Sequence, residues 1–362
     1  LIGAFPASMS DPENNYPFPE KVRRLIWENV AITADEHNKP GKFTAFTGYE
    51  WTSMVEGNNL HRVVVYKDGA DKTAQLPPFS GQDSLDPREL WKALARYEET
   101  TGGEVMAIAH NGNISNGMMF PSVSVDGKKI NRAYAELRAR WEPIYEVSQV
   151  KGDGEAHPTL SPDDEFEAWD WDNIGRTQAK EDWMLKHEYA RGALKLGLEY
   201  ENALGVNPFK VGLIASTDGH NTITTTEEDN FFGKFPESEP GPERMENAMA
   251  ADPLWKNWRI VSSGYAAVWA RENTREAIFD AMKRREVYAT TGSRIEVRFF
   301  GGWTFEEEDI YSPNYLDRGY GAGVPMGGDL TEAPKNTAPS FMIAAVKDPD
   351  GANLDRAQVV KG

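Results

Sequence analysis

The sequence predicts an α/β protein organised around a parallel sheet, either a barrel or a doubly wound sheet. Short apolar runs such as Val105–Ala109 and Val211–Ser216 have the length and composition of buried strands. Helical segments separate such runs over most of the 362 residues, and this alternation is typical of parallel sheets. The sequence has no GxGxxG after a strand and no P-loop, so it gives no support to a nucleotide site.

The first two helices are predicted by the signals at their ends. Residues 19–37 present one apolar face, and Asn38 followed by Pro40 marks the end of that helix. Asp86 is an N-cap residue with a capping-box glutamate three positions later. This pattern predicts a helix over residues 86–97.

Three further helical segments are expected in the second half of the chain. One starts at residues 161–164. A long helix covers residues 178–196 and ends at Gly197. The last helix is capped by Asn273 and ends in the basic run 283–285, which suits the negative end of a helix dipole.

The strands are expected between these helices, and the pattern changes after Arg294. Strands of the main sheet are predicted at residues 43–50, 60–66, 105–109, 143–150, 211–216 and 266–269. Beyond Arg294, strands alternate with turns, and strands are expected at 295–300, 341–346 and 358–360. We therefore divide the chain into a main domain over residues 1–299 and a small β-rich segment over residues 300–362.

The composition excludes several classes of function. Lys and Arg number 39 against 57 Asp and Glu, a net charge of −18. This balance disfavours a nucleic-acid binder, because affinity for phosphate backbones comes mainly from basic residues. The absence of cysteine rules out disulfides, thiolate nucleophiles and cysteine zinc sites, so a metal must be held by His, carboxylate and water. No apolar stretch approaches the ~20 residues needed to cross a bilayer.

Metal-ligand side chains follow the predicted strands at their carboxyl ends. Glu50, His110 and the pair Asp218 and His220 each come just after an apolar run. Gly219, within that pair, allows a sharp turn, so that both side chains can reach one point. The carboxyl ends of parallel strands meet at one face of a barrel, where active sites form, so these residues are candidate ligands. His and carboxylate ligands suit Zn²⁺, Mn²⁺ or Fe, and suit Mg²⁺ or Ca²⁺ poorly.

The other histidines and one glutamate are placed by their sequence neighbours. His61 precedes its strand, but it lies in the loop after the first strand, so we expect it at the same mouth. Glu146 follows an apolar pair and is expected either to bind a metal or to orient a ligand. His157 lies in a glycine-bearing loop, where it contacts substrate or is exposed. His37 is expected at a helix C-terminus and His187 on a solvated helix face.

Each ligand assignment has a structural alternative. Glu50 could be a buried carboxylate paired with Arg62, and His110 a core histidine with satisfied hydrogen bonds. Asp218 and His220 could form a hydrogen-bonded turn. The position of these residues at strand ends favours the metal interpretation.

Five motifs taken together resemble the DUF3604 family, a branch related to the PHP (polymerase and histidinol phosphatase) metallo-hydrolases. They are Gly-Tyr-Glu50-Trp, Asn-Leu-His61-Arg, Ile-Ala-His110-Asn, the stretch YEVSQVKGDGEAHP that contains Glu146 and His157, and Ser-Thr-Asp218-Gly-His220. The similarity extends over nearly the whole chain.

The resemblance implies a distorted (β/α)7 barrel of PHP type, with a cluster of two or three divalent ions (Zn, Mn or Fe) at its carboxyl-terminal face. The implied ligands are Glu50, His61, His110, Asp218 and His220. The family pattern begins with a His-x-His motif, which this sequence lacks before Glu50. We expect that motif and the first strands of the barrel to precede Leu1 in the complete protein.

The implied reaction is hydrolysis of a phosphoester in a small, anionic substrate by a metal-bound hydroxide. We predict Asp218, His157 and Lys151 for catalysis, and Arg62, Asn111, Lys151 and His157 for substrate binding. The long polar segment 221–257 is a candidate lid. Two alternatives stay open: an amide, lactone or ester hydrolase of the amidohydrolase type, and a binding or scaffold module with a degenerate site. Related proteins are often exported, which makes a periplasmic or exported location a further expectation.

Overall fold

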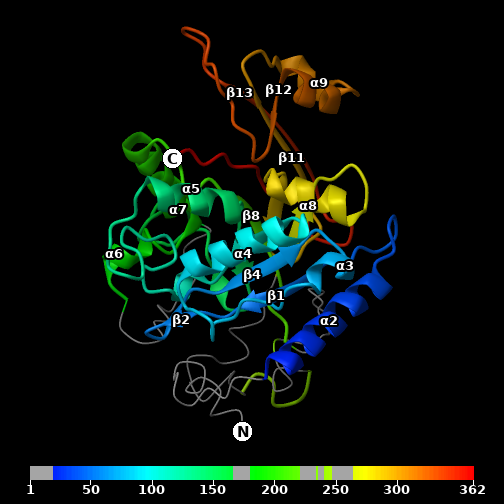
Figure 1. The fold of residues 1–362 in the computed structure, drawn as a ribbon. Helices are drawn as coiled ribbons and strands as arrows, with labels where there is room; N and C mark the ends of the chain where they lie inside the picture. The colour runs from blue at the N-terminus through cyan, green and yellow to red at the C-terminus, as the bar shows by residue number, and fades with distance from the viewer. Residues whose placement is uncertain (1–18, 166–179, 221–233, 235–239, 247–263) are drawn as a thin grey trace.

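The computed structural model describes residues 19–165, 180–220, 234, 240–246 and 264–362. Within them the chain is a mixed α/β protein, which confirms the predicted class. A central sheet is covered by helices, and a smaller β-rich part projects from it (Figure 1). None of the described helices combines the length and the apolar character that crossing a membrane requires.

The central sheet contains six strands. Four of them lie side by side in the order β1 (Thr47–Trp51), β4 (Arg62–Tyr66), β5 (Val105–Ala109) and β6 (Ile144–Gln149). β6 also pairs with β8 (Gly212–Ala215) and with the short β7 (Gly152–Asp153). Every residue of β5 is buried, as expected for a continuous apolar run inside a sheet covered on both faces.

The strand directions correct the prediction of a parallel sheet. β4 runs antiparallel to both β1 and β5, whereas β5, β6 and β8 are parallel. The link from β1 to β4 contains only the short hairpin of β2 (Met54–Val55) and β3 (Asn58–Asn59), which leaves no room for the crossover that parallel neighbours need. As a result, the amino end of β4 lies at the same edge as the carboxyl ends of β1 and β5.

A second pair of strands lies beside β8. β9 (Tyr265–Val268) and β10 (Val287–Thr290) are antiparallel to each other, and a Cβ on Gly212 of β8 would lie 2.8 Å from the side chain of Val287. The described strands do not close into a barrel. The α/β class is therefore confirmed, while the predicted (β/α)7 barrel is not.

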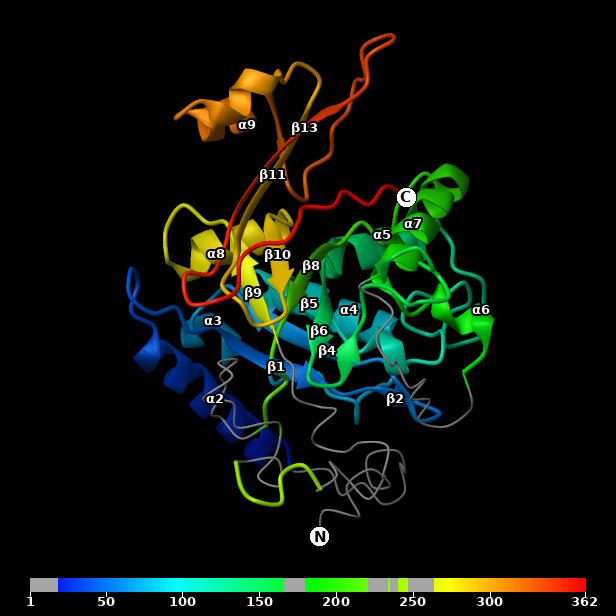
Figure 2. The same cartoon turned by 180° about the vertical axis from the view of Figure 1, so that it is seen from behind.

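Helices cover both faces of the central sheet (Figure 2). α4 (Pro87–Thr101), α5 (Arg132–Trp141) and α7 (Ala190–Leu204) contribute to one apolar cluster on the sheet. α8 (Arg275–Lys283) belongs to another, in which its Phe279 packs with Ile108 and Ile144. α2 (Glu20–His37) lies along β1, and its Trp27 ring packs edge-on against Tyr49 with centroids 5.7 Å apart.

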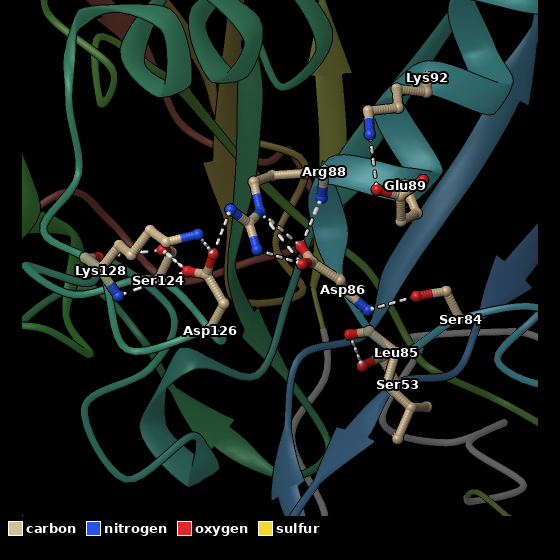
Figure 3. Close-up of polar contacts among 10 residues, drawn as sticks. All are labelled: Ser53, Ser84, Leu85, Asp86, Arg88, Glu89, Lys92, Ser124, Asp126 and Lys128. Atoms are coloured by element: carbon tan, nitrogen blue, oxygen red, sulfur yellow. Dashed lines mark hydrogen bonds and ion pairs between the residues drawn. The ribbon is translucent and has the colours of Figure 1, made fainter.

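The start of α4 is fixed by a polar cluster (Figure 3). Asp86 caps the helix, as predicted, because its Oδ1 accepts a hydrogen bond from the backbone N–H of Arg88 at 2.9 Å. The predicted capping box is not formed, since Glu89 pairs with Lys92 at 2.7 Å instead. The Arg88 guanidinium also pairs with Asp126 at 3.1 Å, which ties the helix start to a turn that precedes α5.

The helix predicted over residues 178–196 is not continuous. Its first two residues, 178–179, lie outside the described residues. It consists of the short α6 (Asp182–Leu185) and of α7. Gly197 lies inside α7, where a Cβ would come within 2.2 Å of the Asn207 side chain, so this glycine serves close packing. α7 ends at Gly205, whose φ of 75° suits a helix C-terminus.

Other helix ends lie near the predictions. α4 continues to residue 101 instead of ending at 97, and α8 is capped by Thr274 instead of Asn273, because the Thr274 side chain accepts from the N–H of Ala277. No helix starts at 161–164 within the described residues. Among the helical elements before Glu296, the prediction lacked α5, α3 (Ala70–Thr73) and the 3-10 turn η2 (Gly112–Ile114).

The β-rich segment forms its own small sheet. β11 (Glu296–Gly302) lies between β12 (Gly323–Pro325) and β13 (Ser340–Val346). The turn η7 (Glu307–Tyr311) and α9 (Tyr315–Ala322) cover one face, where Phe300 packs with Phe305 and Met342. β11 crosses the predicted division at residue 299, and the strand predicted at 358–360 is not formed.

Candidate metal centre

The polar residues singled out in the sequence gather at one edge of the central sheet. Arg62 of β4 lies opposite Trp51 of β1 and Ala109 of β5. Side chains alternate along a strand, so the preceding His61 points to the other side, together with Glu50 and the following His110. His61 precedes its strand, yet it reaches this edge because β4 is antiparallel to its neighbours.

Glu50, His61 and His110 form a compact triad. Oε1 of Glu50 lies 2.7 Å from Nδ1 of His61 and 3.0 Å from Nε2 of His110. The imidazole side chains are 11% and 3% exposed, whereas that of Glu50 is 30% exposed and opens the triad to solvent. Among the described residues, this is the one group of at least three potential ligands whose atoms lie within 4.8 Å of one another.

The protonation of Glu50 and His61 suits metal binding, whereas for His110 the lowering effect of burial is outweighed by the hydrogen bond with Glu50 and the charge of Glu146, which raise its pKa. Burial alone would raise the pKa of Glu50, but hydrogen bonds from His110 and His61 outweigh it and hold the pKa well below its usual range. Burial lowers the pKa of His61 to about 4, against the opposing effect of Glu50. An ionised carboxylate and a neutral imidazole are the forms in which these side chains bind a metal.

The inner nitrogens of both imidazoles face Glu50 and would hold a metal together with its carboxylate, whereas the outer nitrogens face away from it. Nε2 of His61 and Nδ1 of His110 are buried and have no hydrogen-bond partner in the described part of the chain. A buried polar atom in this state costs about 1–3 kcal/mol, so folded proteins contain few of them and each points to an unmet interaction. Nitrogen and carboxylate donors favour Zn²⁺, Mn²⁺ or Fe.

Glu146 of β6 adds a further donor beside the triad. Its Oε2 accepts a hydrogen bond from the Ser216 hydroxyl, while Oε1 is buried and unpartnered among the described residues. Burial raises the pKa of Glu146, although the charge of His110 acts in the opposite direction. The sequence left open whether Glu146 binds a metal or orients a ligand, and its unpartnered oxygen makes it a candidate ligand.

Asp218 and His220 form a second group at this edge. Asp218 itself has a φ of 50°, in the left-handed region that Asp tolerates better than most residues. The sharp turn predicted at Gly219 is therefore made by Asp218 instead. Nε2 of His220 lies 3.2 Å from Oδ1 of Asp218, but the pair does not join the triad as one set of mutually close ligand atoms.

Two lysines contact Asp218. Nζ of Lys151 lies 2.7 Å from Oδ2 of Asp218, and Nζ of Lys234 lies 2.5 Å from the same oxygen. Lys151 was predicted at the site and Lys234 was not. Lys234 follows a Phe-Phe-Gly sequence inside the acidic segment 221–257, and this apolar interruption is the signal that could have indicated it. Most of that segment, with its predicted role as a lid, lies outside the described residues.

The predicted substrate role of Arg62 is wrong. Its side chain is 1% exposed, and Nε pairs with Glu142 at 3.0 Å. Glu142 also pairs with Arg138 at 3.0 Å and accepts a hydrogen bond from Nε1 of Trp91 at 2.9 Å. Burial would raise the pKa of Glu142, but the two guanidiniums outweigh it and lower the pKa. The alternative that Arg62 pairs with Glu50 is wrong for the same reason.

Asn111 and His157 are the remaining residues predicted at the site. Asn111 has a φ of 56° and is 3% exposed, and its Oδ1 is buried without a partner among the described residues. His157 is 6% exposed; its Nδ1 accepts from the backbone N–H of Thr159, and its ring packs on Tyr189. The substrate roles of Asn111 and His157 stay predictions.

The two histidines assigned to helices differ. His37 ends α2, as predicted. His187 is not on a solvated face: it lies between α6 and α7, 6% exposed, with Nδ1 at 2.7 Å from the carbonyl oxygen of Phe120. The predicted long helix is interrupted between α6 and α7, and His187 lies in this interruption with its side chain buried.

The chain is thus an α/β protein with a candidate metal site, the Glu-His-His triad, at the edge of its central sheet. The chain matches the family model described as Protein of unknown function (DUF3604) over residues 5–362, and it belongs to that family. The family resemblance seen in the motifs is thereby confirmed. No match was found among curated proteins or among solved structures.

Proposed function

We propose that this protein is a metal-dependent hydrolase related to the PHP enzymes and that it acts on phosphoesters. The observation that carries this proposal is the triad: Glu50 contacts the inner nitrogens of two buried imidazoles, and the three residues offer ligand atoms within 4.8 Å of one another. Such donors bind divalent ions of the zinc and manganese type. The order of Glu, His, His and Asp-x-His along the chain, which resembles that of PHP enzymes, supports the hydrolase class.

Glu50, His61 and His110 would hold the ion, and Glu146, which lies outside their set of mutually close ligand atoms, would act next to it. A bound divalent ion would lower the pKa of a water and stabilise negative charge on an oxygen of the scissile group. The protein keeps Glu50 ionised through its two histidine partners and keeps His61 neutral through burial, which lowers the pKa of that imidazole. The buried imidazoles also exclude water from the inner side of the site.

Asp218 and Lys151 are the proposed partners of the reacting groups. Burial would raise the pKa of Asp218, but Lys151 and the other nearby cations outweigh it and lower the pKa well below its usual range. The ionised carboxylate can accept a hydrogen bond from the attacking water and orient it. We also propose that His157 protonates the leaving group.

We also propose that the central sheet is part of a distorted PHP-type barrel. The pair β9–β10 continues the layer beyond β8, while β1 stands at the opposite end of the sheet. A crystal structure of the full-length protein tests this idea. A sheet that stays open between β1 and β9 in that structure would contradict it.

Metal content tests the ligand assignment directly. The wild-type protein should retain at least one Zn²⁺ or Mn²⁺ per chain after dialysis, measured by plasma mass spectrometry. H61A and H110A should lose it. H37A is the matched control, since His37 lies at the end of α2, outside the group of close ligand atoms, and should retain the ion. Unchanged metal content in both triad variants would refute the site.

Turnover tests the reaction class. Hydrolysis of p-nitrophenyl phosphate should stop with a chelator and return on addition of Zn²⁺ or Mn²⁺. The same aryl group presented as an acetate ester or an anilide, with a lactone alongside, separates phosphoesterase from ester, amide and lactone hydrolase. Bound metal without turnover of any of these would identify a binding or scaffold module instead.

A further inference from the structure

We propose that Lys151 and Lys234 form an anion subsite that holds the doubly charged phosphoryl group of a phosphomonoester. The role of this subsite in binding a substrate rests on the hydrolase function proposed above. Binding of the anion itself requires neither metal nor turnover, so the subsite can be tested alone.

Two buried ammonium groups share one carboxylate oxygen. Nζ of Lys151 and Nζ of Lys234 lie 2.7 Å and 2.5 Å from Oδ2 of Asp218, and the two lysine side chains are 10% and 4% exposed. Nζ of Lys234 also donates to the backbone carbonyl of Asp218 at 2.9 Å and lies 3.0 Å from Nε2 of His220. Both ammoniums therefore share one carboxylate oxygen as an ion-pair partner, while Glu50 adds a more distant negative charge.

The Lys151 ammonium has donors to spare. An ammonium carries three N–H donors, and among the described residues the Lys151 group pairs with Asp218 alone. The site also opens to solvent, because the His220 side chain next to Asp218 is 43% exposed. A ligand that enters there can accept hydrogen bonds from Lys151 while Asp218 keeps its contact with Lys234.

The backbone holds both lysines in place. The N–H of Lys151 donates to Oε1 of Gln149 at 2.8 Å, and its carbonyl accepts from Nδ2 of Asn113 at 3.1 Å. The carbonyl of Lys234 accepts from the N–H of His220 at 2.8 Å. Both cations are therefore anchored to segments that leave the carboxyl ends of β6 and β8. Pre-positioning of this kind reduces the entropy lost when a ligand binds.

The lysine pair lies next to the triad. Lys151 interacts electrostatically with His61 and His110, and Lys234 does so with Glu50. A phosphoryl group on the two ammoniums would therefore be adjacent to the triad. This places substrate charge and candidate metal at one edge of the sheet.

A phosphomonoester fits the pair better than other anions do. It carries about −1.5 to −2 charges at pH 7 and presents three acceptor oxygens, enough for both ammoniums. A carboxylate or a sulfate ester brings a single charge. Since the whole chain has a net charge of −18, its long-range field repels anions, and local cations are needed to hold one.

Three probes with one aryl group separate these head groups: phenyl phosphate, phenyl sulfate and benzoate. Isothermal titration of the full chain treated with EDTA should give the tightest binding with phenyl phosphate. K151Q and K234Q should each weaken that binding on the order of tenfold or more, since each removes a charged hydrogen-bond donor. K92Q is the control, because Lys92 pairs with Glu89 on the exposed face of α4 and its loss should leave binding unchanged.

The outcomes are distinguishable. Equal affinity of K151Q and wild type for phenyl phosphate would overturn the subsite, and so would equal affinity of wild type for all three probes. Circular dichroism checks folding, and K151Q decides alone if K234Q does not fold. Lysine-dependent phosphate binding, in a protein that hydrolyses no phosphoester after Zn²⁺ or Mn²⁺ is added back, would keep the subsite and reject the hydrolase. Turnover with an unchanged KM in both variants would do the reverse.

Discussion

The two sides of strand β4 bury polar groups in opposite ways. On one side Arg62 pairs with Glu142, which also pairs with Arg138, and all three side chains are 1% exposed. On the other side the neighbouring residue His61 contacts Glu50, and its outer nitrogen is buried without a partner among the described residues. The consecutive residues His61 and Arg62, at the start of β4, therefore belong to two different polar clusters.

This difference shows how a structural cluster can be told from a binding site. The two imidazoles are buried like the Glu142 cluster, whereas the Glu50 side chain is 30% exposed. In the Glu142 cluster each charge has an opposite charge within hydrogen-bond distance, which stabilises the fold. Nε of Arg138 and the outer nitrogens of both imidazoles are alike buried without a hydrogen-bond partner among the described residues, so the two sides differ in their charge pairing: the carboxylate of the triad contacts titratable imidazoles instead of guanidiniums.

The largest effect is expected at Glu142. E142A leaves two buried guanidiniums without their carboxylate and should lower the free energy of unfolding by about 3–5 kcal/mol. Urea denaturation followed by tryptophan fluorescence measures this loss. H110Q in the metal-free protein removes the contact of His110 with Glu50. It should lower the free energy of unfolding by less than half as much as E142A does. A loss in H110Q equal to that in E142A would break the contrast between the two sides.

Metal-linked stability is the next effect. A ligand that binds only the folded state stabilises it by about 2.7 kcal/mol when present at about a hundredfold its dissociation constant. Zn²⁺ or Mn²⁺ should therefore raise the thermal midpoint of the wild-type protein. E142Q, weakened in the other cluster, should keep this response, whereas H61Q and H110Q should lose it. A metal response that survives in H61Q and H110Q would place the ion elsewhere.

The sequence predicted most of the elements that build this edge, because apolar runs such as Val105–Ala109 reveal their strands locally. It did not reveal strand direction. The antiparallel placement of β4 depends on a short connection and on pairing with β5 across a long insertion, and neither has a local signal. Direction in turn decides which strand ends meet.

The site was predictable to the same extent. Glu50, His61 and His110 were chosen because they adjoin apolar runs, and the structure brings them together. Arg62 was misassigned because its partner Glu142 lies 80 residues away in the sequence. Lys234 was missed because only folding shows that it contacts Asp218. Long-range pairing decides which buried charges are satisfied, and a single sequence does not display it.

Two buried tryptophans near Glu142 differ in their hydrogen bonding. Nε1 of Trp91 donates to Glu142 at 2.9 Å, whereas Nε1 of Trp141 is buried with no partner in the described residues. W91F and W141F lose the same volume, but only W91F loses a hydrogen bond to a charged group. W91F should therefore be less stable than W141F by about 1.5 kcal/mol or more, measured by urea denaturation. Equal losses would show that the indole contact to Glu142 adds nothing to stability.

His187 provides the smallest effect, and it concerns a buried histidine outside the triad. Burial lowers its pKa, the hydrogen bond with the Phe120 carbonyl opposes that change, and the charges of Lys186 and Glu199 act in opposite directions. Because the folded pKa lies below the unfolded value of about 6.5, the unfolded state binds more protons as the pH falls through that region. Stability should therefore decrease from pH 7.5 to pH 5.5.

H187Q isolates this contribution, because an amide can still donate to the Phe120 carbonyl without titrating. The drop in urea midpoint between pH 7.5 and pH 5.5 should be smaller in H187Q than in the wild type, while H37Q, altered at the exposed end of α2, should keep the wild-type drop. An unchanged drop in H187Q would mean that the acid sensitivity arises elsewhere. The triad would then be the next place to look, since burial lowers the pKa of His61 to about 4 and protonation of that imidazole opposes folding in the same direction.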